Sequence, residues 1–313
     1  MAVLAIDFGG TSIKFGVIGE GGEILAFSNL VASPTDTIQK NLEAINELLL
    51  TLLSNHAIPK GQLRAIGIAV PSIVGNNNQV LSRYVKYTDA GDFDFNSWAM
   101  SEWGLPITVE NDARAALVGE WKYGAGKGYS DIALLTLGTG VGSAVISEGK
   151  LFKGKHFLGG SLTGHMSINM HGTACNCGFF GCLESEASTW ALPGIASRHP
   201  LFKESSLSTI ENLAFIHLFE AAANGDELAN LLLLHCLKAW GVCAVNLVHA
   251  HDPEIIIISG GIMKRQEQIL PFLQKMVDEY AWLPPGTIII KAAQQVEYAG
   301  LLGMEFLANS SVK

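Results

Sequence analysis

The apolar positions of this chain fall into short unbroken runs and longer stretches with helical spacing. Val3–Asp7 and 132–137 are short runs that end in glycine-rich turns, and each turn leads into a second apolar run, 13–18 or 143–146. Such runs predict strands, and glycine in the turn lets the backbone approach a ligand closely. Two hairpins of one type, far apart in the sequence, predict a duplicated architecture whose halves face a common cleft.

The rest of the pattern alternates helices with strands. Apolar spacing of three and four residues predicts helices at 38–54, 113–123, 209–223 and 227–249. Short apolar runs predict strands at 65–70, 107–110 and 255–258. This alternation predicts an α/β fold with sheets covered on their faces. The run 159–188 is rich in Gly, Cys and His and is expected to be a loop-dominated insert.

Length and charge narrow the class of protein. A chain of 313 residues predicts two domains. We place the first at 1–113, completed by the C-terminal helix 297–313, and the second at 114–296. Net charge is −9 without a long basic run, which disfavours a nucleic-acid or membrane surface.

The N-terminus and the apolar stretches of the sequence indicate the cellular compartment of the protein. The N-terminus runs straight into a strand and has no signal-peptide pattern. The apolar stretch 132–147 is interrupted by glycines and reads as a hairpin, so we expect no transmembrane helix and a cytoplasmic location. In that compartment cysteines are thiols or metal ligands before they are disulfides.

Both glycine-rich turns are candidate phosphate sites. The first comprises Asp7, Gly9, Gly10 and Thr11, and the second comprises Gly138, Thr139 and Gly140. A phosphate chain needs several N–H donors without intervening side chains, which such turns provide. Asp7 is placed to hold Mg²⁺ through water. Either turn alone is more simply explained as an ordinary β-turn, and neither matches a P-loop or a dinucleotide fingerprint.

Asp112 follows an apolar strand and opens a helix in the segment 109–116. One interpretation is a helix N-cap. The other is a catalytic base, because a carboxylate at this junction can accept a proton from a hydroxyl that attacks the γ-phosphate of ATP.

A cysteine cluster is the strongest local signal. Cys175, Cys177 and Cys182 lie within eight residues, and His165 lies ten residues upstream. Three Cys and one His form a closed tetrahedral set of the kind that holds structural zinc. The alternatives are unrelated thiols or one local disulfide. A closed set would pin the loop and fix the tautomer of His165 without activating water.

Together these motifs resemble the ROK family (repressor, open reading frame, kinase) of sugar kinases and sugar-responsive repressors. The resemblance spans nearly the whole chain and is carried by segments 6–11, 109–116, 123–128, 136–142, 164–165, 175–184, 259–261 and 299–303. It implies a two-domain actin-like ATPase (ribonuclease H-like) fold with a ligand cleft between the domains. It also implies a kinase that uses Mg-ATP, contains structural Zn²⁺, and is a possible homodimer.

Carried over residue by residue, the resemblance assigns roles. Asp112 would deprotonate the sugar, normally at its 6-hydroxyl. Asn111, His165 and Glu184 would hydrogen-bond other sugar hydroxyls, and Ser72 is expected beside them. The expected ATP and phosphate residues are Asp7, Gly9, Gly10, Thr11, Lys14, Gly138, Thr139, Gly140, Gly260 and Gly261.

Departures from the family pattern fall on the sugar side. Leu162 stands where a sugar-contacting glutamate is usual, Val70–Gly75 departs from the usual proline-rich segment, and 83–85 replaces a Pro-Asn-Leu segment. The phosphate and adenosine motifs are intact. This division predicts a working kinase with an altered acceptor. The acceptor sugar would lack a hydroxyl at that point, carry an N-acyl group, or bind Ser161 or Thr163 instead.

Two other functions stay open. One is a sugar-binding sensor without catalysis. The family's repressors carry a DNA-binding segment ahead of the first phosphate motif, and this sequence begins only a few residues before it, so a repressor is not expected. The other is a phosphotransferase with another donor, such as polyphosphate, or with an acceptor that is not a simple hexose.

Overall fold

The computed structural model describes residues 1–33, 37–81, 87 and 89–312, and these form two compact units. The first unit comprises Met1–Gly128, Lys153–Gly159 and Gln294–Lys313, and the second comprises Tyr129–Phe152 and Gly160–Ala293. The sequence placed the boundary near residue 113. The helix that begins there stays with the first unit because it packs on the C-terminal helix.

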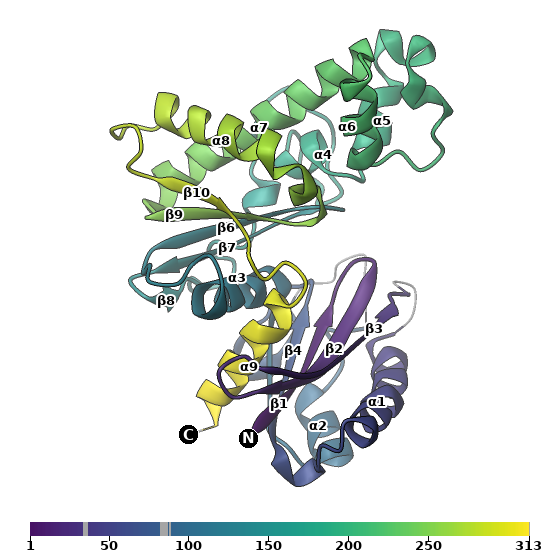
Figure 1. The fold of residues 1–313 in the computed structure, drawn as a ribbon, viewed down its shortest axis with the longest axis vertical. Helices are drawn as coiled ribbons and strands as arrows, with labels where there is room; N and C mark the ends of the chain where they lie inside the picture. The colour runs from purple at the N-terminus through teal and green to yellow at the C-terminus, as the bar shows by residue number, and fades with distance from the viewer. Residues whose placement is uncertain (34–36, 82–86, 88, 313) are drawn as a thin grey trace. The chain divides into compact units, whose positions relative to one another are not determined.

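The first unit is a five-stranded sheet with helices on its faces (Figure 1). Its elements are β1 (Ala2–Phe8), β2 (Ser12–Gly19), β3 (Ile24–Val31), α1 (Ile38–Asn55), β4 (Leu63–Val70), α2 (Phe95–Trp103), β5 (Ile107–Asn111), α3 (Asp112–Tyr123) and α9 (Ala299–Ser311). The strand order is β3-β2-β1-β4-β5. Successive strand residues point to opposite faces, so Leu4 and Ile6 of β1 join the core beneath α1, while Ala5 joins a core with Leu301 of α9.

The second unit repeats this topology. Its elements are β6 (Ile132–Leu137), β7 (Val141–Ser147), β8 (Lys150–Leu151), α4 (Leu183–Ala187), α5 (Leu192–Ser197), α6 (Phe215–Ala223), α7 (Glu227–His251), β9 (Ile255–Ser259), α8 (Gln266–Tyr280) and β10 (Ile289–Ala292). The order β10-β9-β6-β7-β8 reproduces the first sheet, with an antiparallel meander and two parallel strands beside its first strand. The predicted duplication and the α/β class are confirmed.

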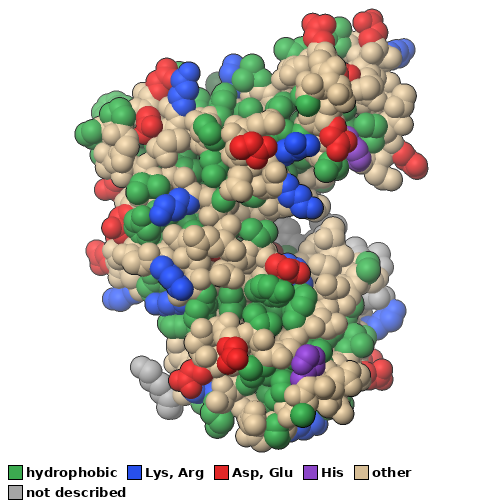
Figure 2. Space-filling view, in the orientation of Figure 1, with side chains coloured by type: hydrophobic (Ala, Val, Ile, Leu, Met, Phe, Trp, Pro, Cys, Tyr) green, Lys and Arg blue, Asp and Glu red, His purple; other side chains and the backbone are tan. Residues whose placement is uncertain are grey.

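Helix α7 passes the length and composition test for a membrane span, which the sequence analysis did not anticipate. Within that window 56% of the helix is buried inside the protein. Trp240, for example, is fully buried, and its indole Nε1 donates to the carbonyl of Ala187 at 2.9 Å. This burial is typical of the core helix of a globular domain. Figure 2 shows acidic and basic side chains interspersed on the face in view.

Small residues bring α3 and α9 into close contact in the first unit. A Cβ atom at Gly119 would overlap the carbonyl oxygen of Ala299, and one at Gly303 would overlap that of Ala115. The other end of α3 is fixed by buried Glu120, which accepts backbone N–H groups from Ala125, Gln294 and Gln295. The helix that begins with Asp112 is therefore held along its length.

We predict that Gly303→Ala lowers the free energy of unfolding by about 3 kcal/mol, because the methyl group has no room against backbone. The matched control is Gly61→Ala, since a Cβ at Gly61 meets nothing within 4 Å. Urea unfolding of both variants measures the difference. Equal stability of the two variants would show that the helices separate without cost.

Candidate active site and metal centre

The predicted residues of the first unit gather at one edge of its sheet. Strands β1, β4 and β5 are parallel, with Ala69 of β4 in register with both Asp7 and Glu110. The carboxyl ends of parallel strands share an edge, so the turn after β1, Ser72 after β4 and Asn111 at the end of β5 are brought to the same side. This is where an open α/β sheet presents ligand-binding residues.

Asn111, and not Asp112, is the N-cap of α3. Its side-chain oxygen accepts from the backbone N–H of Arg114 at 3.1 Å, as an N-cap side chain does. Its amide nitrogen donates to the carbonyl of Ser72 at 3.1 Å and to Oδ1 of Asp112 at 3.0 Å. Asn111 therefore orients the neighbouring carboxylate, and the alternative that Asp112 serves as the cap is wrong.

The pKa values of Asp112 and Asp7 are both raised. Burial, and then the charge of Asp7, raise the pKa of Asp112 to about 7, although the backbone N–H of Ala113 donates to its Oδ1 at 2.8 Å. Burial also raises the pKa of Asp7 to about 6 against the opposing effect of Lys14. A carboxylate with a pKa near neutrality is a stronger proton acceptor than an ordinary one.

Lys14 of β2 and Gly300 of α9 lie beside Asp7. Lys14 lies opposite it in the β1–β2 register, and its Nζ donates to the carbonyl of Glu297 at 2.8 Å. At the N-terminus of α9, a Cβ on Gly300 would overlap the Asp7 carboxylate, so only glycine allows this approach. The positive end of the α9 dipole points toward the aspartate and favours its charged form.

The first glycine-rich turn, predicted to bind phosphate, is tight. Gly9 donates its N–H to the carbonyls of Asp7 and Ser12, both at 3.1 Å, and a Cβ at Gly9 would lie 2.6 Å from the Ser12 oxygen. Gly10 is partly buried beside it, and the Thr11 side chain is exposed.

Tyr87 is a neighbour that the sequence did not reveal. Its hydroxyl donates to the carbonyl of Gly9 at 3.4 Å, and its ring meets Phe8 edge-on with centroids 5.2 Å apart. Burial and the charge of Asp7 raise the pKa of Tyr87 to about 12. The contact joins segments distant in sequence, so no local pattern marks it.

The second unit brings two glycine segments to one edge of its sheet. Thr136 of β6 pairs with Ser259 of β9, so the Gly138–Gly140 turn and Gly260–Gly261 follow aligned parallel strands. Gly260 has φ +105, and a Cβ there would overlap the Leu137 carbonyl. The 138–140 turn is held by the N–H groups of Thr189 and Trp190, which donate to the carbonyls of Gly138 and Thr139.

Glu184 lies directly against this turn. Its Oε2 accepts from the N–H of Val141 at 2.8 Å, and its Oε1 accepts from Nε1 of Trp190 at 3.1 Å. Glu184 is 8% exposed, and a Cβ at Gly140 would lie 2.6 Å from Oε2. Each carboxylate oxygen can accept two hydrogen bonds, so these contacts fix the group and leave capacity for one more donor at each oxygen. No sequence motif marked Trp190 as a site residue.

The four predicted metal ligands are assembled in one place. The ligand atoms of His165, Cys175, Cys177 and Cys182 all lie within 4.8 Å of one another. Cys175 Sγ is 3.6 Å from Nδ1 of His165, and Cys177 Sγ is 3.7 Å from Cys182 Sγ. Zinc–sulfur bonds of about 2.3 Å in a tetrahedron place neighbouring sulfurs about 3.8 Å apart, so the set fits zinc.

The chemistry of the thiols agrees with this geometry. Burial raises the pKa of Cys175 and of Cys182, so a cation is needed to hold both as thiolates at neutral pH. All five cysteines are free thiols. Cys236 and Cys243 are buried in α7, where burial raises each pKa to about 12, and they lie outside the cluster.

One departure from the family pattern, Leu162, lies in the segment just before His165. Leu162 is partly buried and precedes the short 3-10 helix Thr163–His165. The Thr163 hydroxyl is enclosed in the protein and has no hydrogen-bond partner among the described residues, whereas Ser161 is partly exposed. Of the two hydroxyls, Ser161 is the more accessible. Residues 83–85 lie outside the described part of the chain.

Comparison with known proteins places these features in a family. The model of the ROK family matches residues 3–311. A glucokinase of Thermotoga maritima is 31% identical over 97% of this chain and 96% of its own length. An N-acetylmannosamine kinase of Vibrio cholerae is 30% identical over 84% of each chain.

A solved structure shows the same fold. The ROK family glucokinase from Streptomyces griseus, in complex with glucose and AMPPNP, superposes with a TM-score of 0.77 at 28% identity, over 99% of this chain and 100% of its own. This chain belongs to the ROK family and has the actin-like ATPase fold of that family's sugar kinases.

Proposed function

We propose that this protein is an ATP-dependent sugar kinase that transfers the γ-phosphate of ATP to the 6-hydroxyl of a hexose or hexose derivative, with Asp112 as the base. The observation that carries the proposal is that two adjacent residues at the start of α3 have separate roles. Asn111 caps the helix and orients Asp112, and the pKa of Asp112 is raised to about 7. Membership of a family that includes ATP-using sugar kinases supports the activity.

In this mechanism Asp112 accepts the proton of the attacking hydroxyl. The two hydrogen bonds from Ala113 and Asn111 are both made to Oδ1, and we assign Oδ2 as the atom that takes the proton. As the proton moves, the hydroxyl oxygen forms its bond to the γ-phosphorus and the bond to the β-phosphate oxygen breaks, with ADP as the leaving group. Phosphoryl transfer depends mainly on positioning and charge stabilisation, so a well-oriented carboxylate suffices as base.

The glycine-rich turns would bind the phosphates of ATP. The adenine base of ATP would lie near Gly260–Gly261. Mg²⁺, when bound with ATP, would neutralise charge that develops on the phosphates. Asp7 would hold it through water, and Lys14 beside Asp7 limits the net charge there. Thr11 and Thr139 both expose their side chains and would donate hydroxyls to phosphate oxygens.

His165 and Glu184 would bind the sugar. Zinc on Nδ1 of His165 would fix the tautomer with its proton on Nε2, which then donates to a sugar oxygen. Glu184 is already oriented by Val141 and Trp190 and would accept from a second hydroxyl. A ring of oriented donors and acceptors rejects a sugar that leaves one of them unpaired.

Leu162 is proposed to set the acceptor. A leucine cannot accept a hydrogen bond, so the sugar would lack a hydroxyl there, carry an N-acyl group, or donate to partly exposed Ser161 instead. We predict that Leu162→Glu raises kcat/KM for glucose or mannose about tenfold or more, since one hydrogen bond to a charged group contributes about 1.5–3 kcal/mol. Leu162→Gln, which has a similar length without charge, is the matched variant. No gain with either hexose would refute the assignment of Leu162.

The proposed function is tested by product analysis. Each sugar of a panel is incubated with Mg-ATP, and the position of the new phosphate is read from phosphorus–proton couplings in the NMR spectrum of the product. Coupling to the two C6 protons is the expected result. Phosphate on another carbon would keep the kinase and reject the 6-hydroxyl.

A sugar-binding sensor is the alternative function. It would bind a sugar, raise the melting temperature of the protein and form no ADP. The oriented carboxylate of Asp112 favours the kinase, because a sensor does not need a base.

A further inference from the structure

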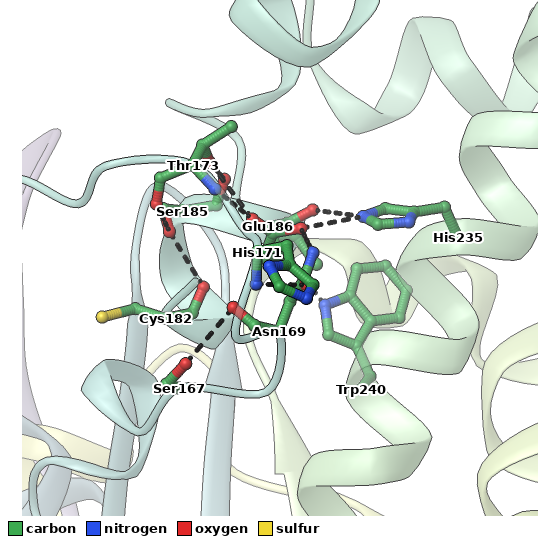
Figure 3. A network of polar contacts seen from close by, with 10 residues as sticks. Ser167, Asn169, His171, Thr173, Cys182, Ser185, Glu186, His235 and Trp240 are labelled. Carbon is green, nitrogen blue, oxygen red and sulfur yellow. Dashed lines mark hydrogen bonds and ion pairs between the residues drawn. The ribbon is translucent and has the colours of Figure 1, made fainter. Parts of the chain in front are cut away.

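Glu186 is the centre of a polar network beside residues 169–182, which carry the three cysteines and are called the cysteine loop here. Neither the sequence motifs nor the proposed mechanism uses Glu186. Figure 3 shows the carboxylate of Glu186, on α4, between the loop and His235 of α7. Its Oε1 accepts from the backbone N–H of Thr173 at 2.9 Å and from the Thr173 hydroxyl at 3.2 Å. Its Oε2 accepts from the side-chain amide of Asn169 at 3.3 Å.

The loop is seated on this carboxylate without room for a side chain. A Cβ at Gly172 would lie 2.5 Å from Oε1 of Glu186 and 2.5 Å from Cα of Gly181. Thr173 is also held from the other side, because its carbonyl accepts from the N–H of Gly181 at 2.8 Å. These contacts join the two arms of the loop, one leading to Cys175 and the other ending at Cys182.

The network is anchored to the core on its far side. The backbone carbonyl of Glu186 is 3.0 Å from Nε2 of His235, and Oε2 is 3.8 Å from the same nitrogen. The next residue, Ala187, accepts from the indole of fully buried Trp240 at 2.9 Å. The position of Glu186 is therefore set by α7 and is not a property of the loop alone.

The buried carboxylate of Glu186 depends on the cysteine loop for its hydrogen-bond donors. Glu186 is 6% exposed, and a buried carboxylate is costly unless it is hydrogen-bonded. Two of its donors, Thr173 and Asn169, belong to the loop, and hydrogen bonds to a charged group are stronger than neutral ones. Thr173 and Asn169 donate to the carboxylate in the same loop conformation that brings Cys175 and Cys177 to His165 and Cys182.

We propose that Glu186 is a positioning residue for the zinc site: it holds the cysteine loop in the binding conformation before the metal arrives. This inference rests on the proposed zinc site. Glu186 binds no metal itself and acts through Thr173, two residues before Cys175. Preorganisation of this kind lowers the conformational entropy lost on binding and so tightens the metal affinity.

The test compares zinc affinities of the full-length protein by competition with a chromophoric chelator. In Glu186→Gln an NH2 group replaces one of the carboxylate oxygens. This group cannot accept a hydrogen bond from the N–H or O–H donors that face it. The expected result is a zinc Kd about tenfold weaker or more, the range seen when groups behind metal ligands are altered. The matched control is Glu220→Gln, an exposed glutamate on α6, which should keep the wild-type Kd.

Two further readouts separate positioning from a merely structural role. If Glu186 only stabilises the fold, the melting temperature falls equally with and without zinc, and the zinc Kd is unchanged. Positioning instead predicts a smaller rise in melting temperature on adding zinc, and faster amide exchange at residues 172–178 in the metal-free variant. Thr173→Val, which removes one donor, should weaken zinc binding to a smaller extent and carries the test if Glu186→Gln does not fold.

The outcomes distinguish the inference from the site on which it rests. Wild-type protein that binds no zinc would overturn the metal site. Wild-type protein that binds zinc, with an unchanged Kd in Glu186→Gln or Thr173→Val, would overturn the role of Glu186 and leave the metal site standing.

Discussion

Asp112→Asn is expected to lower kcat by about 10²–10⁴-fold, the usual contribution of a positioned general base. Asparagine keeps the size of the side chain and can still bind a hydroxyl, so the KM for sugar should change little. Steady-state kinetics at saturating Mg-ATP measures both constants. Asp92→Asn, which alters an exposed carboxyl of the same unit, is the control. A variant that retains more than a tenth of the wild-type kcat would mean that the proton leaves by another route.

The same substitution should stabilise the ligand-free protein at alkaline pH. The pKa of Asp112 is raised from 3.8 to about 7 in the folded state, so the folded protein holds a proton that the unfolded chain has released. Folding stability from this group is present below pH 4 and is lost as the pH rises through 7. The pKa shift corresponds to a change of at most about 4 kcal/mol in the free energy of unfolding. Water that reaches this partly buried carboxyl reduces that change.

The expected signature is a double difference in the free energy of unfolding. Between pH 5 and pH 8 the wild type should lose about 2 kcal/mol relative to Asp112→Asn. Urea unfolding of the ligand-free proteins at both values measures it. Parallel pH dependence of the two proteins would show that the Asp112 carboxyl is not shielded from water.

Removal of zinc has the second large expected effect. At a zinc concentration a thousandfold above Kd, bound metal stabilises a folded protein by about 4 kcal/mol. For a unit of this size that corresponds to a fall of about 10 °C in melting temperature after chelation. The KM for sugar should rise as well, because the ring of His165 would lose the proposed metal ligation that orients it.

The matched variant for this prediction is Cys243→Ser, a buried cysteine outside the cluster, beside Cys177→Ser within it. Only Cys177→Ser should lose the response of melting temperature to added zinc. A chelated protein with unchanged melting temperature and KM would rule out a structural metal here.

The sequence predicted the elements whose apolar runs are continuous. The strands around Val3–Asp7 and 132–137 were found because both faces of their sheets are buried, which leaves unbroken apolar runs. Strand β3 was missed because partly exposed Ser28 and exposed Asn29 interrupt its apolar pattern. The predicted helix start at 209 is wrong: a turn follows the 3-10 segment Ser206–Thr209, and α6 begins at Phe215 with His217 accepting the N–H of Ala214.

The site was predictable where one segment carries the chemistry. The spacing of Cys175, Cys177 and Cys182 indicated a metal cluster, and the structure assembles it with His165. The helix cap could not be assigned, because Asn111 and Asp112 both suit that position and the choice depends on the contact of Asn111 with Ser72. Glu186 and its partner His235 meet only through tertiary packing, which leaves no mark in the local sequence.

The central claim is tested most directly by ADP release from Mg-ATP over a panel of sugars with zinc-replete protein. The panel includes glucose, mannose, allose, fructose, glucosamine, N-acetylglucosamine and N-acetylmannosamine. We predict that at least one sugar supports turnover that Asp112→Asn loses. If no sugar supports turnover while some raise the melting temperature, the protein binds sugars without phosphorylating them, and the assignment of Asp112 as a base is contradicted.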